Sequence, residues 1–266
     1  MAAALATIDL TRLGGLDSVE VLRAQHRQAS HEQARLMAAM VEVGLCGLGP
    51  DDELPRMDEP DEFSADEIRA ALSWTRAAAN AQLWLAWDLI HRLPGVYAAL
   101  DSGDIDVPKA RVFSEWTDGL TNEQAATICD RLLGEAPHLT TGQLTERIKR
   151  LAVAVDPDWA RRRYEQAVRD RKVVGYRNAD GSANLSGYSL PADRVAAACS
   201  HLDTLAKKAK HTGDARPIDR IRADLYLLML DGSCTGWTEP DIIAHLLTMA
   251  DAEADSSHTA LVHPHP

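Results

Sequence analysis

Apolar residues along this chain follow the spacing of α-helices almost everywhere, and that spacing is broken only once. The clearest helical stretch has apolar residues at i, i+4, i+7 and i+11: Leu144, Ile148, Leu151 and Val155. Between Lys172 and Ser189, β-branched and aromatic residues instead flank a turn signal at Asp180 and Gly181. We therefore predict a mainly α protein, a multi-helix domain with one β-hairpin inserted near residues 172–189.

Helix-start signals divide the helical part into separate elements. In two capping boxes a Ser or Thr precedes a Glu or Gln by three residues, which predicts helix starts at Ser64 and Thr121. Proline fits the first position of a helix, so Pro108, Pro191 and Pro217 predict further starts.

Two polar segments suggest the domain organisation. Residues 1–47 are expected to form an amino-terminal helical segment that packs separately, followed by an acidic linker rich in Pro and Gly over 48–63. A helical domain is predicted for 64–232, and a short helix with a flexible tail for 233–266.

The amino-terminal segment contains half of a heptad pattern. Within residues 18–43, apolar side chains recur every seven positions at Leu22, Ala29, Leu36 and Val43, while the companion positions are polar. Such a seam suits a helix that packs on its own domain or on a partner, so self-association through residues 18–43 is one expectation.

Composition limits the classes of function. The 266 residues carry a formal net charge of −12, which argues against a protein that coats nucleic acid with its whole surface. The four cysteines are far apart, so we expect neither a disulfide framework nor a structural zinc site. No apolar run approaches the roughly 20 residues of a membrane span, and the amino terminus lacks a cationic signal start, so we expect a cytoplasmic protein without a membrane partner.

The total charge hides a basic segment. Residues 145–222 hold 17 Lys and Arg against 10 Asp and Glu, a net charge of +7, while the remainder carries −19. Two predicted helices and the chain after them supply the candidate phosphate contacts: Arg147, Lys149, Arg150, Arg161, Arg162, Arg163, Arg169, Arg171 and Lys172. The alternative is a solvated face, because Arg161 with Glu165 and Glu165 with Arg169 have the i,i+4 spacing of helical ion pairs.

A second charged group follows in the chain. It consists of Asp214, Arg216, Arg220, Arg222 and Asp224. These side chains are expected either to join helices in a partly buried network or to clamp an anion between guanidinium groups.

Other motifs give weaker signals. Residues 66–93 have some features of a helix-turn-helix, but a plain helical hairpin is the favoured interpretation because the second helix has one early basic residue, Arg76. The helix after Asp156 is expected to turn Ala160, Tyr164 and Val168 inward.

There is no P-loop, GxGxxG, GxSxG or HExxH pattern, so we expect no cofactor, no metal and no catalytic residues, and an enzyme is the least favoured class.

Several short motifs resemble a known bacterial family. They are Arg92-Leu93-Pro94, Gly103-Asp104-Ile105, Asp156-Pro157, the Arg161–Val173 run, Asp180-Gly181, the segment Leu185–Pro191, and Asp214-x-Arg216-x3-Arg220-x-Arg222-Ala223-Asp224. Over roughly residues 64–231 the chain resembles the family called domain of unknown function 222, or the 13E12 repeat family. Pro217 stands where Ser or Thr is usual in that family.

The resemblance carries an expectation about function. Members of the family commonly carry this helical domain ahead of an HNH endonuclease domain, and the group is linked with mobile DNA. An HNH site needs a ββα unit with histidines and an asparagine around a metal. We expect no such unit after Asp231, where residues 233–250 suggest one short helix.

The working hypothesis is therefore a non-catalytic, HNH-nuclease-associated module that contacts DNA through a basic helical face. The alternative is an oligomerisation or protein-interaction scaffold, a truncated mobile-element protein. Sequence alone gives neither a DNA sequence preference nor an oligomeric state.

Overall fold

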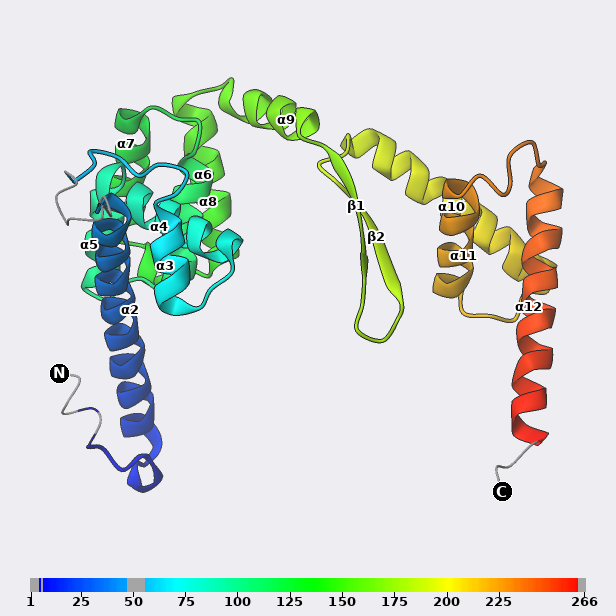
Figure 1. The fold of residues 1–266 in the computed structure, drawn as a ribbon, viewed down its shortest axis with the longest axis horizontal. Coiled ribbons are helices and arrows are strands. Elements are labelled where there is room, and N and C mark those ends of the chain that lie inside the picture. The colour runs from blue at the N-terminus through cyan, green and yellow to red at the C-terminus, as the bar shows by residue number, and fades with distance from the viewer. Residues whose placement is uncertain (1–4, 6, 47–55, 263–266) are drawn as a thin grey trace. The chain divides into compact units, whose positions relative to one another are not determined.

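The computed structural model describes residues 5, 7–46 and 56–262, with side chains as far as Glu253 (Figure 1). Helices dominate this part of the chain, and one antiparallel hairpin interrupts them, so the predicted mainly α class is confirmed. The chain divides into two compact units, Met1–Tyr164 and Glu165–Pro266. The division falls inside the predicted 64–232 domain.

Unit 1 (Met1–Tyr164) contains helices joined by turns and loops, and no strand among its described residues. Its elements are η1 (Leu10–Arg12), α2 (Gly15–Leu45), α3 (Ala65–Leu72), α4 (Arg76–His91), α5 (Pro94–Asp101), α6 (Val107–Thr117), α7 (Asn122–Leu132), η2 (Ala136–His138) and α8 (Thr141–Val155). The next helix, α9 (Trp159–Arg169), begins in unit 1 and crosses the division.

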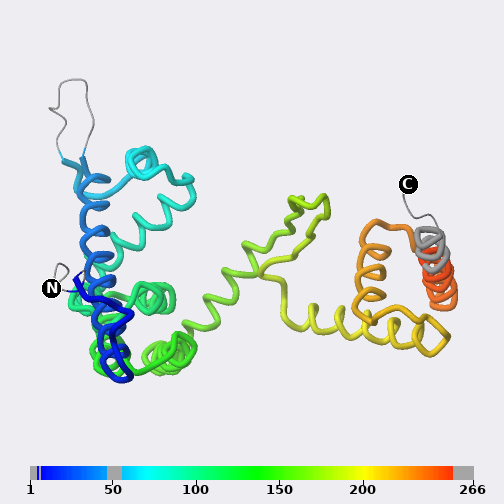
Figure 2. Tube along the Cα trace, turned by 90° about the horizontal axis from the view of Figure 1, so that it is seen from below, coloured from blue at the N-terminus to red at the C-terminus, as the bar shows by residue number. Residues whose placement is uncertain are grey.

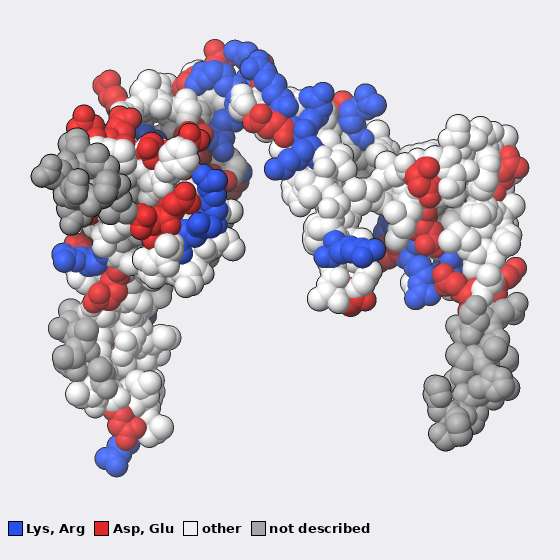
Figure 3. All heavy atoms as spheres, viewed as in Figure 1, with Lys and Arg blue, Asp and Glu red and all other residues white. Residues whose placement is uncertain are grey.

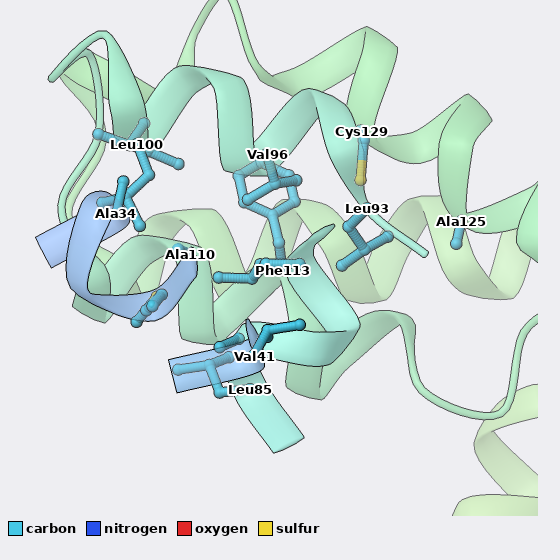
Figure 4. Packing of buried hydrophobic residues seen from close by; sticks show 14 of the residues in the cluster. Ala34, Val41, Leu85, Leu93, Val96, Leu100, Ala110, Phe113, Ala125 and Cys129 are labelled. Atoms are coloured by element: carbon cyan, nitrogen blue, oxygen red, sulfur yellow. The ribbon is translucent and has the colours of Figure 1, made fainter. Parts of the chain in front are cut away.

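Phe113 of α6 lies fully buried in the core of unit 1. Figure 4 shows it among side chains contributed by α2, α4, α5 and α7. The predicted stripe of α8 belongs to the same core, since Leu144 and Ile148 are fully buried. Transfer of such side chains from water stabilises a fold by about 1.5–3 kcal/mol each.

The amino-terminal helix does not pack separately, contrary to our expectation. Ala34, Met37, Val41 and Leu45 of α2 are buried in the core of unit 1. Gly103, which follows α5, lets the backbone approach α2 closely, because a Cβ at this position would lie 2.7 Å from the Arg27 carbonyl oxygen. The predicted acidic linker lies largely outside the described residues, which resume at Arg56.

The predicted helix starts are right to within one residue: Pro191 and Pro217 precede α10 and α11 as N-cap residues, and Pro108 is the second residue of α6. The predicted capping mechanism is right at one of two positions. Thr121 and Gln124 form the predicted reciprocal capping box, whereas the Ser64 side chain does not cap α3. Ser64 Oγ instead accepts a hydrogen bond from the Asp61 backbone N–H at 2.9 Å and donates to the Asp61 carboxylate at 3.1 Å. A Ser side chain that hydrogen-bonds to the preceding loop is not available to cap the helix that follows.

Unit 2 (Glu165–Pro266) contains the hairpin and a cluster of three helices (Figure 2). Its elements after α9 are β1 (Lys172–Arg177), β2 (Ala183–Tyr188), α10 (Ala192–Thr212), α11 (Ile218–Leu230) and α12 (Glu239–Val262). Leu205, Ile221, Leu225 and Leu246 form the centre of its core. Helix α12 continues to Val262, through most of the segment predicted as a flexible tail, and residues 263–266 lie outside the description.

The hairpin closes through polar turn residues. Gly181 has a φ of +88°, a conformation that favours glycine. The Asp180 carboxylate accepts hydrogen bonds from the backbone N–H and hydroxyl of Ser182 at 2.9 and 2.6 Å. These bonds lower the pKa of Asp180. The pairing register runs from Lys172↔Tyr188 to Arg177↔Ala183.

The core predicts a stability difference that tryptophan fluorescence can measure. Phe113→Ala is expected to destabilise unit 1 by about 3–5 kcal/mol, because it removes a buried ring and leaves a cavity. The control, Val153→Ala, changes a side chain that is 43% exposed and should stay within about 0.5 kcal/mol of the parent. Equal unfolding midpoints for the Phe113→Ala variant and the parent would contradict this core assignment. Five of the six tryptophans report on unit 1: Trp74, Trp84, Trp87, Trp116 and Trp159.

Candidate nucleic-acid interface

The predicted phosphate contacts divide between the two units. Arg147, Lys149, Arg150 and Arg161–Arg163 belong to unit 1, and Arg169, Arg171 and Lys172 belong to unit 2. Figure 3 shows Lys and Arg side chains gathered along α9, with Asp and Glu among them. A cation held by a neighbouring carboxylate is less available to a phosphate, so the internal partners of each side chain decide its role.

The three cations of α8 differ in their internal contacts. Arg147 forms an ion pair with Glu135. Lys149 Nζ donates to Glu146 at 3.0 Å and lies 4.2 Å from the centre of the Trp116 ring. The side chain of Arg150 is exposed and forms no ion pair or hydrogen bond with any described residue.

The three arginines that open α9 are engaged within unit 1. Arg161 donates to Asp158 at 3.1 Å. Arg162 binds the Asp156 carboxylate at 2.5 Å and the Gly119 carbonyl at 3.2 Å. The bond from Arg162 lowers the pKa of Asp156. The Gly119 contact attaches the first turn of α9 to the loop between α6 and α7, and the two carboxylates belong to the connection between α8 and α9.

Arg163 is held between aromatic rings, a contact that was not predicted from the sequence. Its guanidinium carbon lies 4.9 Å from the ring centre of Trp116 and 5.3 Å from that of Trp159. It also donates to the Glu115 carbonyl at 2.9 Å. Trp159 is 3% exposed, and its indole N–H donates to the Asp118 carbonyl at 2.9 Å. A tryptophan at the start of an otherwise polar helix was the available signal for this contact.

The predicted inner face of α9 is wrong. Of the three predicted residues, Ala160 is exposed, Tyr164 is 51% exposed and only Val168 is half-buried, while Trp159 and Arg163 make the contacts with unit 1. The one buried residue among the described residues of α9 is Trp159 in its first turn, so the helix has no buried apolar stripe along its length.

The cations that follow in unit 2 have few internal partners. Arg171 donates to the Val168 carbonyl at 2.7 Å. Arg169 and Lys172 are exposed, and neither has an ion pair or hydrogen bond to a described residue other than backbone bonds of its own element. Arg150, Arg169 and Lys172 are thus the predicted contacts whose charged groups stay unpaired in the described part of the chain.

The second predicted group surrounds Arg216 in unit 2. Its guanidinium makes a bidentate contact with Asp214, from Nε at 3.1 Å and from Nη2 at 2.8 Å. It also donates to Asp224 at 2.8 Å, to Glu253 at 3.4 Å and to the Leu246 carbonyl at 3.0 Å. The side chains of Arg216 and Asp214 are 7% and 0% exposed.

All five N–H groups of Arg216 therefore have acceptors inside unit 2. Arg220 donates to the same Glu253 at 3.0 Å, and Arg222 pairs with Asp203 at 2.5 Å and Asp219 at 2.7 Å. The structure thus brings the five predicted residues into the region where α10, α11 and α12 meet. The hydrogen bonds from Arg216 lower the pKa of Asp214.

A similar arginine in unit 1 was not predicted. Arg92 makes a bidentate contact with Asp88, four residues earlier on α4. It also donates to the Thr117 hydroxyl at 3.0 Å and the Ser114 carbonyl at 3.2 Å, both on α6. Ser114 Oγ donates to Asp88 at 2.6 Å. The i,i+4 spacing of Asp88 and Arg92 was the available signal.

The described residues contain neither a metal-ligand cluster nor a membrane-spanning helix. Among the side chains described, which end at Glu253, no three of His, Cys, Asp or Glu stand close enough to share a metal ion. In the same part of the chain, no helix combines the length and apolar character of a membrane span.

Comparison with known proteins gives one match. The profile of a family described as "Domain of unknown function (DUF222)" matches residues 17–246. No curated protein and no solved structure matches the chain.

The Arg216 network predicts a pH dependence of unit 2. The pKa of Asp214 is lowered in the folded chain, so ionised Asp214 stabilises the fold fully above the ordinary value of 3.8. That contribution is lost as the pH falls through the lowered value. Asp214→Asn is expected to destabilise unit 2 by about 3–5 kcal/mol near neutral pH and to weaken its acid sensitivity.

Hydrogen exchange of peptides from α10, α11 and α12, followed from pH 7 into the acid range, measures both effects. Asp193→Asn, at an exposed carboxylate of the same unit, is the control. Unchanged protection in the Asp214→Asn variant would show that the network does not hold these helices together.

Proposed function

The chain belongs to the DUF222 family, and from that premise we propose that it is a non-catalytic module that contacts the phosphate backbone of DNA. The contacts are made by Arg150 of unit 1 and by Arg169 and Lys172 of unit 2. An association with HNH nucleases and mobile DNA, and a cytoplasmic location, are parts of the same proposal.

The observation that carries the proposal is the contrast between paired and unpaired cations. Arg161, Arg162 and Arg163 bind acceptors within unit 1, whereas the charged groups of Arg150, Arg169 and Lys172 have no partner among the described residues. An exposed, unpaired guanidinium or ammonium group can neutralise a phosphate and release its condensed counterion. No internal ion pair has to be broken for that contact.

The remaining predicted residues take supporting roles in this proposal. Arg162 and Arg163 fix the start of α9, the helix that carries Arg169. Arg216 binds Asp214 and Asp224 and so holds the helices of unit 2 together, which favours the structural network over the anion clamp. Because its N–H groups are all occupied, Arg216 has no donor left for an external anion.

Salt titration of DNA binding tests the proposal. For a labelled duplex, log Kd should change linearly with log salt concentration. Combined Arg150→Gln, Arg169→Gln and Lys172→Gln substitutions should reduce the slope by about 0.9 for each phosphate that the protein no longer neutralises.

Arg131→Gln is the matched control, because Arg131 is an exposed cation of α7 outside the basic segment. This variant should keep the parent slope. Absence of duplex binding at low salt, or a slope unchanged by the triple substitution, would refute the phosphate contacts.

A second candidate function is self-association through α2. The first half of this helix has no buried residue before Ser30, and Leu22 of the predicted seam is 69% exposed. Nearby Leu16 is 84% exposed, and Val43, at the other end of the seam, is 42% exposed. Exposed apolar side chains along a helix whose other face packs on the core are a recognised feature of interaction surfaces. This proposal makes the chain an oligomerisation scaffold.

Sedimentation velocity tests whether the chain associates with itself through α2. If α2 is a contact surface, the parent chain sediments faster with rising concentration, and Leu22→Glu abolishes that dependence because it places a charge in an apolar interface. Val153→Glu, at a half-exposed aliphatic position on α8, is the control and should behave like the parent. A parent chain that remains monomeric at all concentrations would exclude the scaffold.

A further inference from the structure

The hairpin of unit 2 has two faces with different chemistry. Side chains alternate along each strand, so the register places one set of six residues on one face. This set, here called the tyrosine face, comprises Lys172, Val174, Tyr176, Asn184, Ser186 and Tyr188. It contains one cation, two aromatic rings and no carboxylate.

The opposite face is turned towards α11. Tyr226 of that helix donates a hydrogen bond to the Leu185 carbonyl at 3.3 Å. A shallow groove lies between the hairpin and α11. Its lining from the hairpin is Gly175, Arg177, Ala183 and Leu185 of this opposite face, along with Tyr176 and Asn184. The tyrosine face therefore lies mainly on the side of the hairpin away from α11.

The two tyrosine rings are open to contact. Tyr176 is 51% exposed and Tyr188 is 46% exposed, and neither hydroxyl has a hydrogen-bond partner among the described residues. Val174 lies between them on the same face and is 37% exposed. A two-stranded hairpin is marginally stable alone in water, so a ligand that covers these rings would also stabilise it.

The charge around the rings favours an anionic ligand. Lys172 is on the tyrosine face itself, and Arg169 and Arg171 immediately precede β1. The nearest carboxylate on the chain, Asp170, accepts a hydrogen bond from Gln166 at 2.8 Å. Aromatic rings beside unpaired cations are the combination that binds unpaired nucleic-acid bases, since the rings stack on bases while the cations meet the backbone.

We propose that the tyrosine face binds single-stranded DNA, with Tyr176 and Tyr188 each stacking on an unpaired base. This inference rests on the proposed DNA contact and names the form of DNA. The rings are four ladder positions apart, about 13 Å along the strands, so each ring takes its own base. Lys172 and Arg169 meet phosphates at the base of the hairpin.

The face is poorly suited to the alternative of reading a duplex. A β-ribbon in the major groove recognises bases through side chains such as Arg, Lys, Asn or Gln. Lys172, the cation on this face, lies in the ladder position farthest from the turn. Asn184 is the amide on this face, and its Nδ2 donates to Asn178 Oδ1 at 3.0 Å within the turn. Stacking requires a base outside a helical stack, so the rings select single strands.

Binding of the full chain to two labelled probes tests the inference. The probes are an oligothymidylate of about 20 nucleotides and a duplex of the same length. Tyr176→Ala and Tyr188→Ala should each weaken oligothymidylate binding by about fivefold or more. Tyr176→Phe and Tyr188→Phe keep the ring and should bind like the parent. Duplex binding should be the same in all four variants.

The outcomes separate this inference from the proposed function. If the alanine variants bind oligothymidylate as the parent does, or if they lose duplex binding equally, the stacking role is wrong and the phosphate contacts stand. If the parent binds neither probe, both proposals fail. Crosslinking of the parent chain to a 5-iodouracil-substituted oligonucleotide gives a readout independent of variant folding. Crosslinks in the peptides that carry Tyr176 or Tyr188 support the face, and crosslinks confined to other peptides overturn it.

Discussion

The packing of the first turn of α9 against unit 1 fixes which arginines of that helix are engaged inside the protein. Trp159 is buried and Arg163 lies against two indole rings, so the helix is held where it leaves unit 1. The rest of α9 needs no further packing and exposes polar side chains. Arginines of one helix therefore have different roles. Arg163 packs, Arg162 pairs with Asp156, and Arg169 remains unpaired in the described part of the chain.

Each unit also contains an arginine whose donors are all used internally. Arg92 ties α4 to α6, and Arg216 ties α11 to α12, in both cases through a bidentate carboxylate and backbone carbonyl oxygens. Burying a charge is costly unless every donor finds an acceptor, and a saturated guanidinium meets that condition. Such a group gives orientation to helices that apolar packing alone would leave free to slide.

The sequence predicts this fold well where one residue pattern has one structural solution. The stripe of α8, the capping box at Thr121 and the hairpin turn at Gly181 all depend on local spacing, and the structure has all three. The seam proposed for α2 is different. Alanine and methionine at Ala34 and Met37 give the buried stripe, while the seam residues Leu22 and Val43 are largely exposed. Several apolar spacings coexist on that helix, and only the tertiary contacts select among them.

The sequence predicts which segment of the chain is basic, but it does not predict which of its cations are paired inside the protein. The net charge of that segment shows why. The basic segment of +7 counts Arg162 and Arg216 equally with Arg150 and Lys172. In the folded chain Arg162 pairs with Asp156 and Arg216 pairs with Asp214, so these carboxylates neutralise the two guanidinium charges locally. These two carboxylates thus act as internal partners that fix particular arginines. The cations left unpaired in the described part of the chain, Arg150 in unit 1 and Arg169 and Lys172 in unit 2, therefore follow from pairing geometry rather than from the sum of charges.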